Sequence, residues 1–533
     1  MESQSELPQA MEGVLQTPNY ATKATNTEIS PLLRVPLEVL LLISSYLTTQ
    51  EYGVLRRVCR QLELSLFKEF SSEFFTKRSF MLTEHSLSTL VDISKSRLST
   101  SVAYLTISLK HPSPSYHGPI GTTVPTDSEA GIRSNYLRQE IMDHQALINS
   151  GYDLELLTEA FQNLPSLQTV SLRDFDSTGR NRDGSGVWRP YGAPTISIKT
   201  GYNVEAPRYA RGIDIGFSQG ANYVSRTFLT VLRALGNTKG PNTPPRLEAI
   251  LRKCHLPEVA FYIPPRLEPV ILPVLKDLTT IFLELGPSSL TGRIVTNMEY
   301  CSGFQLTAFL SRTTSLEHLR LNFRDCVEDE SNSLFKWLTQ SPESRVDSQV
   351  DIPEGTIMVS VFPQIPAAPS LPRLEQLDIG MATIELRTLV NLVKRFRSSL
   401  RRISLHKVTL HDPTAKSCRI NIWAKLINQL CKSNLQLSAI NFSFLKQVNR
   451  RHVYHVSFLE DHQNPDNRSL TKEWAGKDFQ RNSKDLIESM FVAWPGTNGE
   501  GDELSSDSES FDDDGEVEID LDEDVDDDPE DDI

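Results

Sequence analysis

The sequence is poor in cysteine, and the few cysteines present show no pairing pattern. Six occur in 533 residues, and no two of them form a short pair. They are Cys59, Cys254, Cys301, Cys326, Cys418 and Cys431. Since a disulfide framework needs densely paired cysteines, this spacing predicts free thiols in a reducing compartment.

Long apolar runs are also missing. The longest, within Val39–Ile43, is far too short to span a bilayer. The first twenty residues have neither the basic start nor the apolar core of a secretory signal. We therefore expect a soluble protein of the cytoplasm, the nucleus or both, with no membrane partner.

Catalytic signatures are absent as well. The chain contains no GxxxxGK[ST], GxGxxG or GxSxG motif. His452 and His455 lie three residues apart in a strand-like run, so they are expected to face opposite sides and to share no metal. The run Asp512-x-Asp514-Gly515 resembles part of a calcium loop, but Leu521 stands where the bidentate carboxylate is needed. We expect no enzyme activity, no metal and no cofactor.

Charge is distributed very unevenly. The formal net charge is −15, yet residues 500–533 alone hold 20 acidic groups and no basic one. Residues 1–499 carry 54 basic against 49 acidic groups, a formal charge of +5, which does not favour direct nucleic-acid binding. The segment 499–533 is expected to be disordered, because its charges repel one another. It could bind a basic protein partner, act as an electrostatic decoy or serve solubility alone.

The segment 31–80 has more apolar residues than its own core needs. Pro36 suits the first turn of a helix that ends near Leu47. One face of this helix carries Leu40, Ile43 and Leu47. A second apolar face carries Val39, Leu42 and Tyr46.

A second helix is expected to follow at once. Thr48-x-x-Glu51 predicts a capping box, and a single stripe then continues to Leu66. The stripe consists of Tyr52, Leu55, Cys59, Leu62 and Leu66. Since the first helix has two apolar faces and the second only one, something else must cover the surplus.

The pattern of this segment resembles the F-box, in particular its fungal form, which continues into a run of phenylalanines. The resemblance rests on Leu33-x-Val35-Pro36-x-Glu38-Val39-Leu40-x-x-Ile43-x-x-Tyr46-Leu47 and on Leu55-x-x-Val58-Cys59-Arg60. Leu62 departs from it, because many F-boxes carry Trp there. The resemblance implies docking onto a Skp-type adaptor protein and, through it, a cullin. The expected adaptor-binding residues are Val35, Pro36, Leu37, Leu40, Ile43, Leu47, Leu55 and Val58. The alternative is an ordinary helical hairpin packed on the following domain.

The rest of the chain repeats a Leu-x-x-Leu-x-Leu unit, usually after a helical pattern. The units are Val102/Leu105/Ile107, Leu167/Val170/Leu172, Leu278/Ile281/Leu283, Leu316/Leu319/Leu321, Leu374/Leu377/Ile379, Leu400/Ile403/Leu405 and Leu437/Ile440/Phe442. An eighth candidate, from Leu247 and Ile250, fails because Arg252 takes the last apolar place. A helix, a turn and a short strand are the unit of a leucine-rich repeat.

The unequal spacing of the units predicts degenerate repeats with long insertions, at 111–133, 174–220 and 341–370. The expected fold class is α/β. It comprises a disordered segment 1–30, a helical F-box at 31–80, an irregular leucine-rich-repeat-like solenoid at 81–498 that binds the substrate, and a disordered acidic tail at 499–533. His452–Phe458 and the apolar residues 486–494 are expected to cap the solenoid. The alternative is an unrelated α/β domain.

Alternation along the strands predicts one shared polar face. It would carry Thr169, Ser171, Arg173, Thr280, Phe282, Glu284, His318, Arg320, Asn322, Gln376, Asp378, Gly380, Arg402, Ser404, His406, Ala439, Asn441 and Ser443. The candidate substrate-binding residues among them are Arg173, Phe282, His318, Arg320, Asn322, Asp378, Arg402 and His406. The function expected from the resemblance is that of a substrate receptor of an SCF cullin-type ubiquitin ligase, with an unknown protein substrate. The alternative is a repeat scaffold that binds the adaptor or basic nuclear proteins outside a ligase.

Overall fold

The computed structural model describes most of the chain between residues 30 and 494. The described ranges are 30–113, 128–177, 182, 187–207, 219–238, 244–290, 294–296, 299–301, 303–326, 328–340, 366–415, 419–433, 435–450, 452–460, 467–476 and 479–494. Internal contacts divide the chain into the units Met1–Val492 and Ala493–Ile533, and the description below concerns the first. The expected disordered segments, 1–30 and 499–533, lie outside the described residues except for residue 30, as do 114–127, 178–181, 183–186, 208–218 and 341–365 of the three insertions.

The N-terminal elements are four short helices. They are the 3₁₀ helix η1 (Pro31–Arg34) and the α-helices α1 (Leu37–Ser45), α2 (Thr49–Arg57) and α3 (Arg60–Phe75). The predicted capping box is confirmed, since Thr48 and Glu51 bond each other's backbone N–H at the start of α2.

The single second helix expected after Thr48 is wrong, because it is broken into α2 and α3. Cys59 takes an extended backbone between them, with φ −156° and ψ 161°. The apolar stripe keeps its spacing across this break, so periodicity alone does not reveal it. The stripe still faces inward, with Tyr52, Leu62 and Leu66 buried.

These helices have their own small hydrophobic core. It comprises Leu40, Tyr52, Leu62, Leu66 and Phe74, and it is separate from the large core of the following domain. The Tyr52 ring lies 5.9 Å from the rings of both Phe70 and Phe74. The phenylalanine run therefore packs back onto α2.

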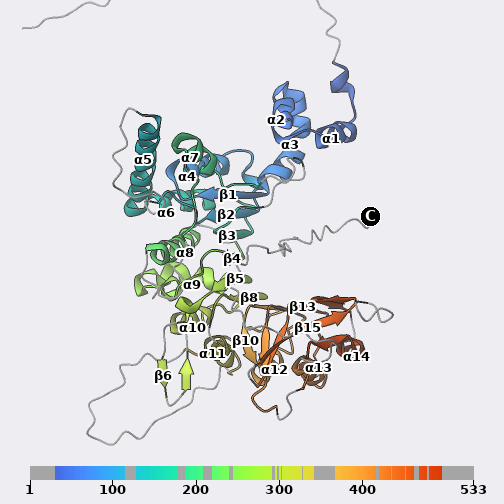
Figure 1. Cartoon of the computed structure of the whole chain (residues 1–533). Coiled ribbons are helices and arrows are strands. Elements are labelled where there is room, and N and C mark those ends of the chain that lie inside the picture. The colour runs from blue at the N-terminus through green and yellow to red at the C-terminus, as the bar shows by residue number, and fades with distance from the viewer. Residues whose placement is uncertain are drawn as a thin grey trace, which may run out of the picture. The chain divides into compact units, whose positions relative to one another are not determined.

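A sheet of ten strands forms the body of the domain (Figure 1). In spatial order the strands are β1 (Lys77–Met81), β2 (Tyr104–Ser108), β3 (Thr169–Arg173), β4 (Arg246–Ile250), β5 (Thr280–Leu285), β8 (His318–Phe323), β9 (Gln376–Gly380), β11 (Arg402–His406), β13 (Ala439–Ser443) and β17 (Thr471–Ala475). All neighbours from β1 to β13 are parallel and follow chain order, whereas β17 pairs antiparallel with β13. The mixed α/β architecture is thus as expected, and each of the seven Leu-x-x-Leu-x-Leu units supplies one strand.

The rejected eighth candidate is also a strand, in a different register. Leu247 of β4 pairs with Val170 and Ile281, and Ala249 takes the inward position expected for a leucine. Both side chains are buried, whereas Arg252 lies beyond the strand. The expectation failed because it aligned Ile250 instead of Ala249 with the inward leucines.

Helices cover the side of the sheet onto which the inward leucines project. They are α4 (Glu84–Ser94), α5 (Glu129–Ser150), α6 (Tyr152–Gln162), α7 (Ala193–Thr200), α8 (Gln219–Asn237), α9 (Glu268–Asp277), α10 (Phe304–Leu310), α11 (Glu328–Leu338), α12 (Leu386–Arg395), α13 (Ile422–Cys431) and α14 (Phe479–Glu488). The 3₁₀ helices η2 (Ser99–Ser101), η5 (Glu258–Phe261), η6 (Pro265–Leu267) and η7 (Pro287–Ser289) join them. Among the described helices, none combines the length and hydrophobicity that crossing a membrane requires.

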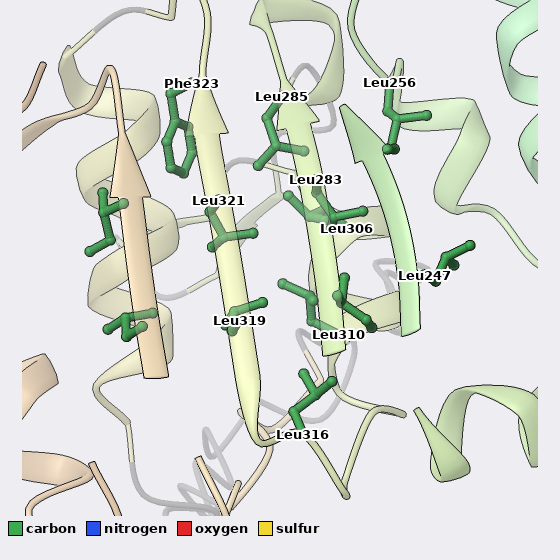
Figure 2. Packing of buried hydrophobic residues seen from close by; sticks show 14 of the residues in the cluster. Leu247, Leu256, Leu283, Leu285, Leu306, Leu310, Leu316, Leu319, Leu321 and Phe323 are labelled. Carbon is green, nitrogen blue, oxygen red and sulfur yellow. The ribbon is translucent and has the colours of Figure 1, made fainter. Parts of the chain in front are cut away.

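The packing between sheet and helices repeats from strand to strand. Figure 2 shows Leu283 and Leu285 of β5 beside Leu319 and Leu321 of β8, with Leu306 of α10 against them. All five are at most 1% exposed. Burying such a side chain stabilises the fold by roughly 1.5 to 3 kcal/mol.

Short strands form a second ladder next to the first. Its order is β10 (Thr383–Glu385), β12 (Thr409–His411), β14 (Lys446–Asn449), β15 (His452–Leu459) and β16 (Arg468–Ser469), and β18 (Met490–Val492) pairs with β15. A separate hairpin joins β6 (Ile294–Thr296) and β7 (Glu299–Cys301). Met381, Lys407 and Phe444 link the two large sheets, each with φ between 51° and 53°.

Buried histidine gives the domain a predicted acid sensitivity. His144 of α5 is 2% exposed, and its Nδ1–H donates to the Leu82 carbonyl at 2.9 Å. Burial, followed by the nearby His111, lowers the pKa of His144 to about 4. This folded-state pKa lies below the unfolded value of 6.5, so the unfolded chain binds the proton first as the pH falls. The free energy of unfolding is therefore at its full value above pH 6.5 and decreases as the pH falls towards 4.

We expect this effect to reach about 2 kcal/mol of the free energy of unfolding between pH 7 and pH 5. Urea unfolding at both pH values would measure it. The variant His144→Gln lacks this titration, so its stability should fall less over the same interval. An equal fall in both proteins would contradict the assignment.

Candidate functional site

One face of α1 is an exposed apolar stripe. Val39, Leu42, Ile43 and Tyr46 recur at the spacing i, i+3, i+4 and i+7, so they lie along one side of the helix. Their exposed fractions are 45%, 57%, 40% and 82%. Clusters of exposed apolar side chains of this kind mark interaction sites. We call these four residues the α1 stripe.

The opposite face of α1 fills the small N-terminal core. Leu40 is 3% exposed, and Leu41 and Leu47 pack partly buried against the same core. This core is complete without the α1 stripe. Of the two expected apolar faces, one is internal and one is open, but Ile43, which was expected beside Leu40 and Leu47, lies on the open face.

The structure corrects the expected adaptor-binding set. Leu40 cannot contact a partner because it is sealed in the core, and Leu47, Leu55 and Val35 are half-buried against that core. Pro36, Leu37, Ile43 and Val58 are exposed, as a docking role requires.

Sequence reasoning omitted four exposed residues from this set. They are Val39, Leu42, Tyr46 and Val54. The first three formed the second apolar face predicted for the helix, so the periodicity contained their signal. It did not say which of the two faces the core would take.

Arg182, from the long insertion after β3, contacts the N-terminal helices. Its Nε and Nη2 donate to the two carboxylate oxygens of Glu73 on α3, at 2.7 and 2.8 Å. Its Nη1 donates to the carbonyl of Leu47 at 2.7 Å and also to that of Ser44. The guanidinium carbon lies 4.7 Å from the centre of the Tyr52 ring. Arg182 thus gives a donor to the Leu47 carbonyl just after α1, adds a second donor to the Ser44 carbonyl, and ties the insertion to α3.

The polar face of the large sheet is the second candidate surface. Its first strands are closed to solvent, since Thr169, Ser171 and Glu248 are each at most 7% exposed. Arg173 is 3% exposed, and its Nη2 donates to the Tyr104 hydroxyl at 2.9 Å. The expectation that Arg173 contacts a substrate is therefore wrong, because its guanidinium is enclosed by its own domain.

The middle strands keep accessible side chains. Phe282, His318, Arg320, Asn322, Asp378 and His406 are half-buried, and Arg402 is exposed. Strand pairing places Phe282, Arg320 and Asp378 in one row. The structure thus brings together seven of the eight residues proposed for this surface.

Neighbouring side chains on these strands are linked to one another. Nε2 of His318 lies 2.6 Å from Oδ2 of Asp378, and its ring meets that of Phe282 edge-on at 4.7 Å. Asn322 donates to Glu284 at 3.2 Å. Gly380 makes room for this asparagine, since a Cβ there would lie 2.1 Å from Oδ1 of Asn322.

No catalytic or metal centre emerges in the described part of the chain. There, no group of three or more His, Cys, Asp or Glu residues is arranged to hold a metal. His452 and His455 both lie on β15 with exposed side chains. Burial raises the pKa of the Cys254 and Cys326 thiols, which keeps them protonated and unreactive.

Comparison with protein families agrees with the geometry of the N-terminal helices. Residues 32–63 match the family model of the F-box domain. No curated protein matches the chain. The match covers α1, α2 and the start of α3, which include the α1 stripe and the core residues Leu40, Tyr52 and Leu62. The chain therefore carries an F-box domain, the module through which substrate receptors bind Skp-type adaptors and, through them, a cullin.

Proposed function

We propose that this protein is the substrate receptor of an SCF cullin-type ubiquitin ligase, and that the α1 stripe is its adaptor-binding surface. The observation that carries the proposal is the exposure of four apolar side chains on α1 within the matched F-box. Leu37, Val54 and Val58 of the same matched region are also exposed. An adaptor that covers these side chains removes them from water, which favours association.

The strand domain is the proposed substrate-binding part. Its parallel strands follow one another in chain order, with a helix between most neighbours, which supports an irregular leucine-rich-repeat-like solenoid. The accessible polar face of β5, β8, β9 and β11 is the surface proposed for a protein substrate. This receptor would act by position, since holding the substrate near the ubiquitin-transfer machinery raises its effective concentration.

The double variant Leu42→Asp with Tyr46→Asp tests the adaptor surface. Each change places a charge where an apolar contact is expected, so we expect adaptor affinity to fall about 100-fold or more. Co-purification of the adaptor and cullin with the full chain would measure the loss. The core residue Leu40 is unsuitable for this test, because Leu40→Asp would unfold the F-box itself.

A matched control is available on the strand domain. Ile198 and Tyr136 are 83% and 52% exposed and lie on α7 and α5. The variant Ile198→Asp with Tyr136→Asp should leave adaptor recovery unchanged. Equal recovery with the two double variants would refute the α1 stripe as the adaptor surface.

A further inference from the structure

The accessible strand face carries two arginines that form no ion pair among the described residues. Arg320 of β8 is half-buried, and its guanidinium carbon lies 5.5 Å from the centre of the Phe282 ring. Arg402 of β11 is exposed. Neither guanidinium forms an ion pair with a carboxylate of the described chain.

The acidic groups on the same face are already occupied. Asp378 lies between the two arginine-bearing strands, but its carboxylate is held by His318 and by the Gln376 amide, 3.2 Å away. Glu284 is 3% exposed and lies 3.8 Å from Nε of Arg324, and burial raises the pKa of its carboxyl to about 7. Both carboxylates therefore already have partners on this face, and neither forms an ion pair with Arg320 or Arg402 among the described residues.

His406 of β11 lies close to Arg320 and to the further cation Lys407. Its ring is half-buried, and its buried Nδ1 has no hydrogen-bond partner within the described chain. The pKa of His406 is lowered to about 4, first by burial and then by the positive charges of Lys407 and Arg320. Lys407, which follows β11, thus adds a positive charge near Arg320 and His406.

The two arginines have a spacing that suits an extended chain. They lie on β8 and β11 with only β9 between them. Ser404 is the β11 residue in the row of Arg320, and Arg402 lies two residues before it along the strand. Two strand spacings and the offset of two residues along the strands together separate the two backbone positions by about 12 Å, the length of about four residues of extended peptide. Two acidic side chains of such a peptide could contact both guanidinium groups at once.

We propose that the strand face from β5 to β11 binds an extended acidic segment of the protein substrate, with Arg320 and Arg402 binding its carboxylates and Phe282 contacting a neighbouring apolar side chain. The proposal rests on the proposed receptor function and names its substrate class. Charge complementarity selects an acidic rather than a basic segment. Nucleic acid is disfavoured, because residues 1–499 are close to neutral and these strands offer only a few cations.

Fluorescence anisotropy with short labelled peptides tests the proposal on the full chain bound to its adaptor. The probes are a peptide of alternating glutamate and glycine, its glutamine counterpart, its lysine counterpart and a single-stranded RNA of the same length. We expect the glutamate peptide to bind best and to weaken as salt is added. The double variant Arg320→Gln with Arg402→Gln should weaken its binding about tenfold or more.

The matched control removes two cations from another surface. Arg387 and Lys394 are exposed on α12, so Arg387→Gln with Lys394→Gln changes net charge equally without touching the strand face. This variant should bind the glutamate peptide like the parent. All proteins should still recover the adaptor, which separates failure of this proposal from failure of the F-box assignment.

Three results would overturn the proposal. The first is equal binding of the glutamate and glutamine peptides. The second is equal loss of binding in both double variants, which would mean that only net charge matters. The third is tighter binding of the RNA than of the glutamate peptide, with the same dependence on Arg320 and Arg402, which would make the face a nucleic-acid site.

Discussion

Replacing Arg182 with alanine is expected to loosen the F-box from the insertion that contacts it. The side chain of Arg182 is only 9% exposed, and the change removes the Arg182 donors of Glu73 and of the Leu47 carbonyl, whereas the Ser44 carbonyl keeps the Leu47 N–H. Losing a largely buried pair of this kind costs about 3 kcal/mol, which corresponds to about a 100-fold increase in local opening. Hydrogen exchange of the α1 and α3 amides would measure it.

Two further variants serve as an intermediate case and as a control for this test. Arg182→Lys keeps the charge but loses the bidentate geometry, so exchange should lie between that of the parent and that of the alanine variant. Arg189, in the same insertion, is exposed and makes only a 3.4 Å contact with Asn203, so Arg189→Ala should leave exchange unchanged. If Arg182→Ala exchanges like the parent, the contact does not hold the F-box.

Replacing Asp153 with alanine is expected to destabilise the strand domain strongly. Asp153 is fully buried on α6 and accepts two hydrogen bonds from Arg226 of α8, at 2.6 and 2.8 Å. Arg226 also donates to the Ile148 carbonyl at 2.7 Å. Removing one partner leaves the other charge uncompensated, so the free energy of unfolding should fall by about 3 to 5 kcal/mol. Urea denaturation would measure the loss.

An exposed ion pair provides the contrast. Arg133 and Glu129 lie on one turn of α5 with side chains 51% and 80% exposed. Arg133→Ala should therefore cost less than about 1 kcal/mol. Asp153→Leu combined with Arg226→Met should recover part of the loss, because no buried charge is left alone. Equal losses for Asp153→Ala and Arg133→Ala would show that the α6–α8 pair contributes little.

The two proposed surfaces give the chain a simple division of roles. The α1 stripe is apolar and lies on a small core of its own, whereas the strand face is polar and lies on the large core. A substitution on one surface therefore has no shared core through which to disturb the other. For this reason adaptor recovery can serve as the control for substrate-binding variants.

The sequence by itself determined the local structure. The Thr48 and Glu51 capping box and the seven leucine-spaced strands depend on neighbouring residues and on alternation, so pattern alone predicts them. Alternation also predicted which side chains share the polar strand face. It failed at β4, where Ala249 replaces the expected leucine, because a small residue gives the pattern no signal.

Only the tertiary structure decided what covers each face. Periodicity gave α1 two apolar faces, and only packing against Tyr52 and Leu62 buried Leu40 and left Leu42 and Tyr46 open. Arg182 reaches Glu73 across 109 residues of sequence, and no local pattern encodes such a contact. The physical reason is that local sequence fixes backbone conformation and side-chain direction, whereas burial depends on elements that the fold brings from far along the chain.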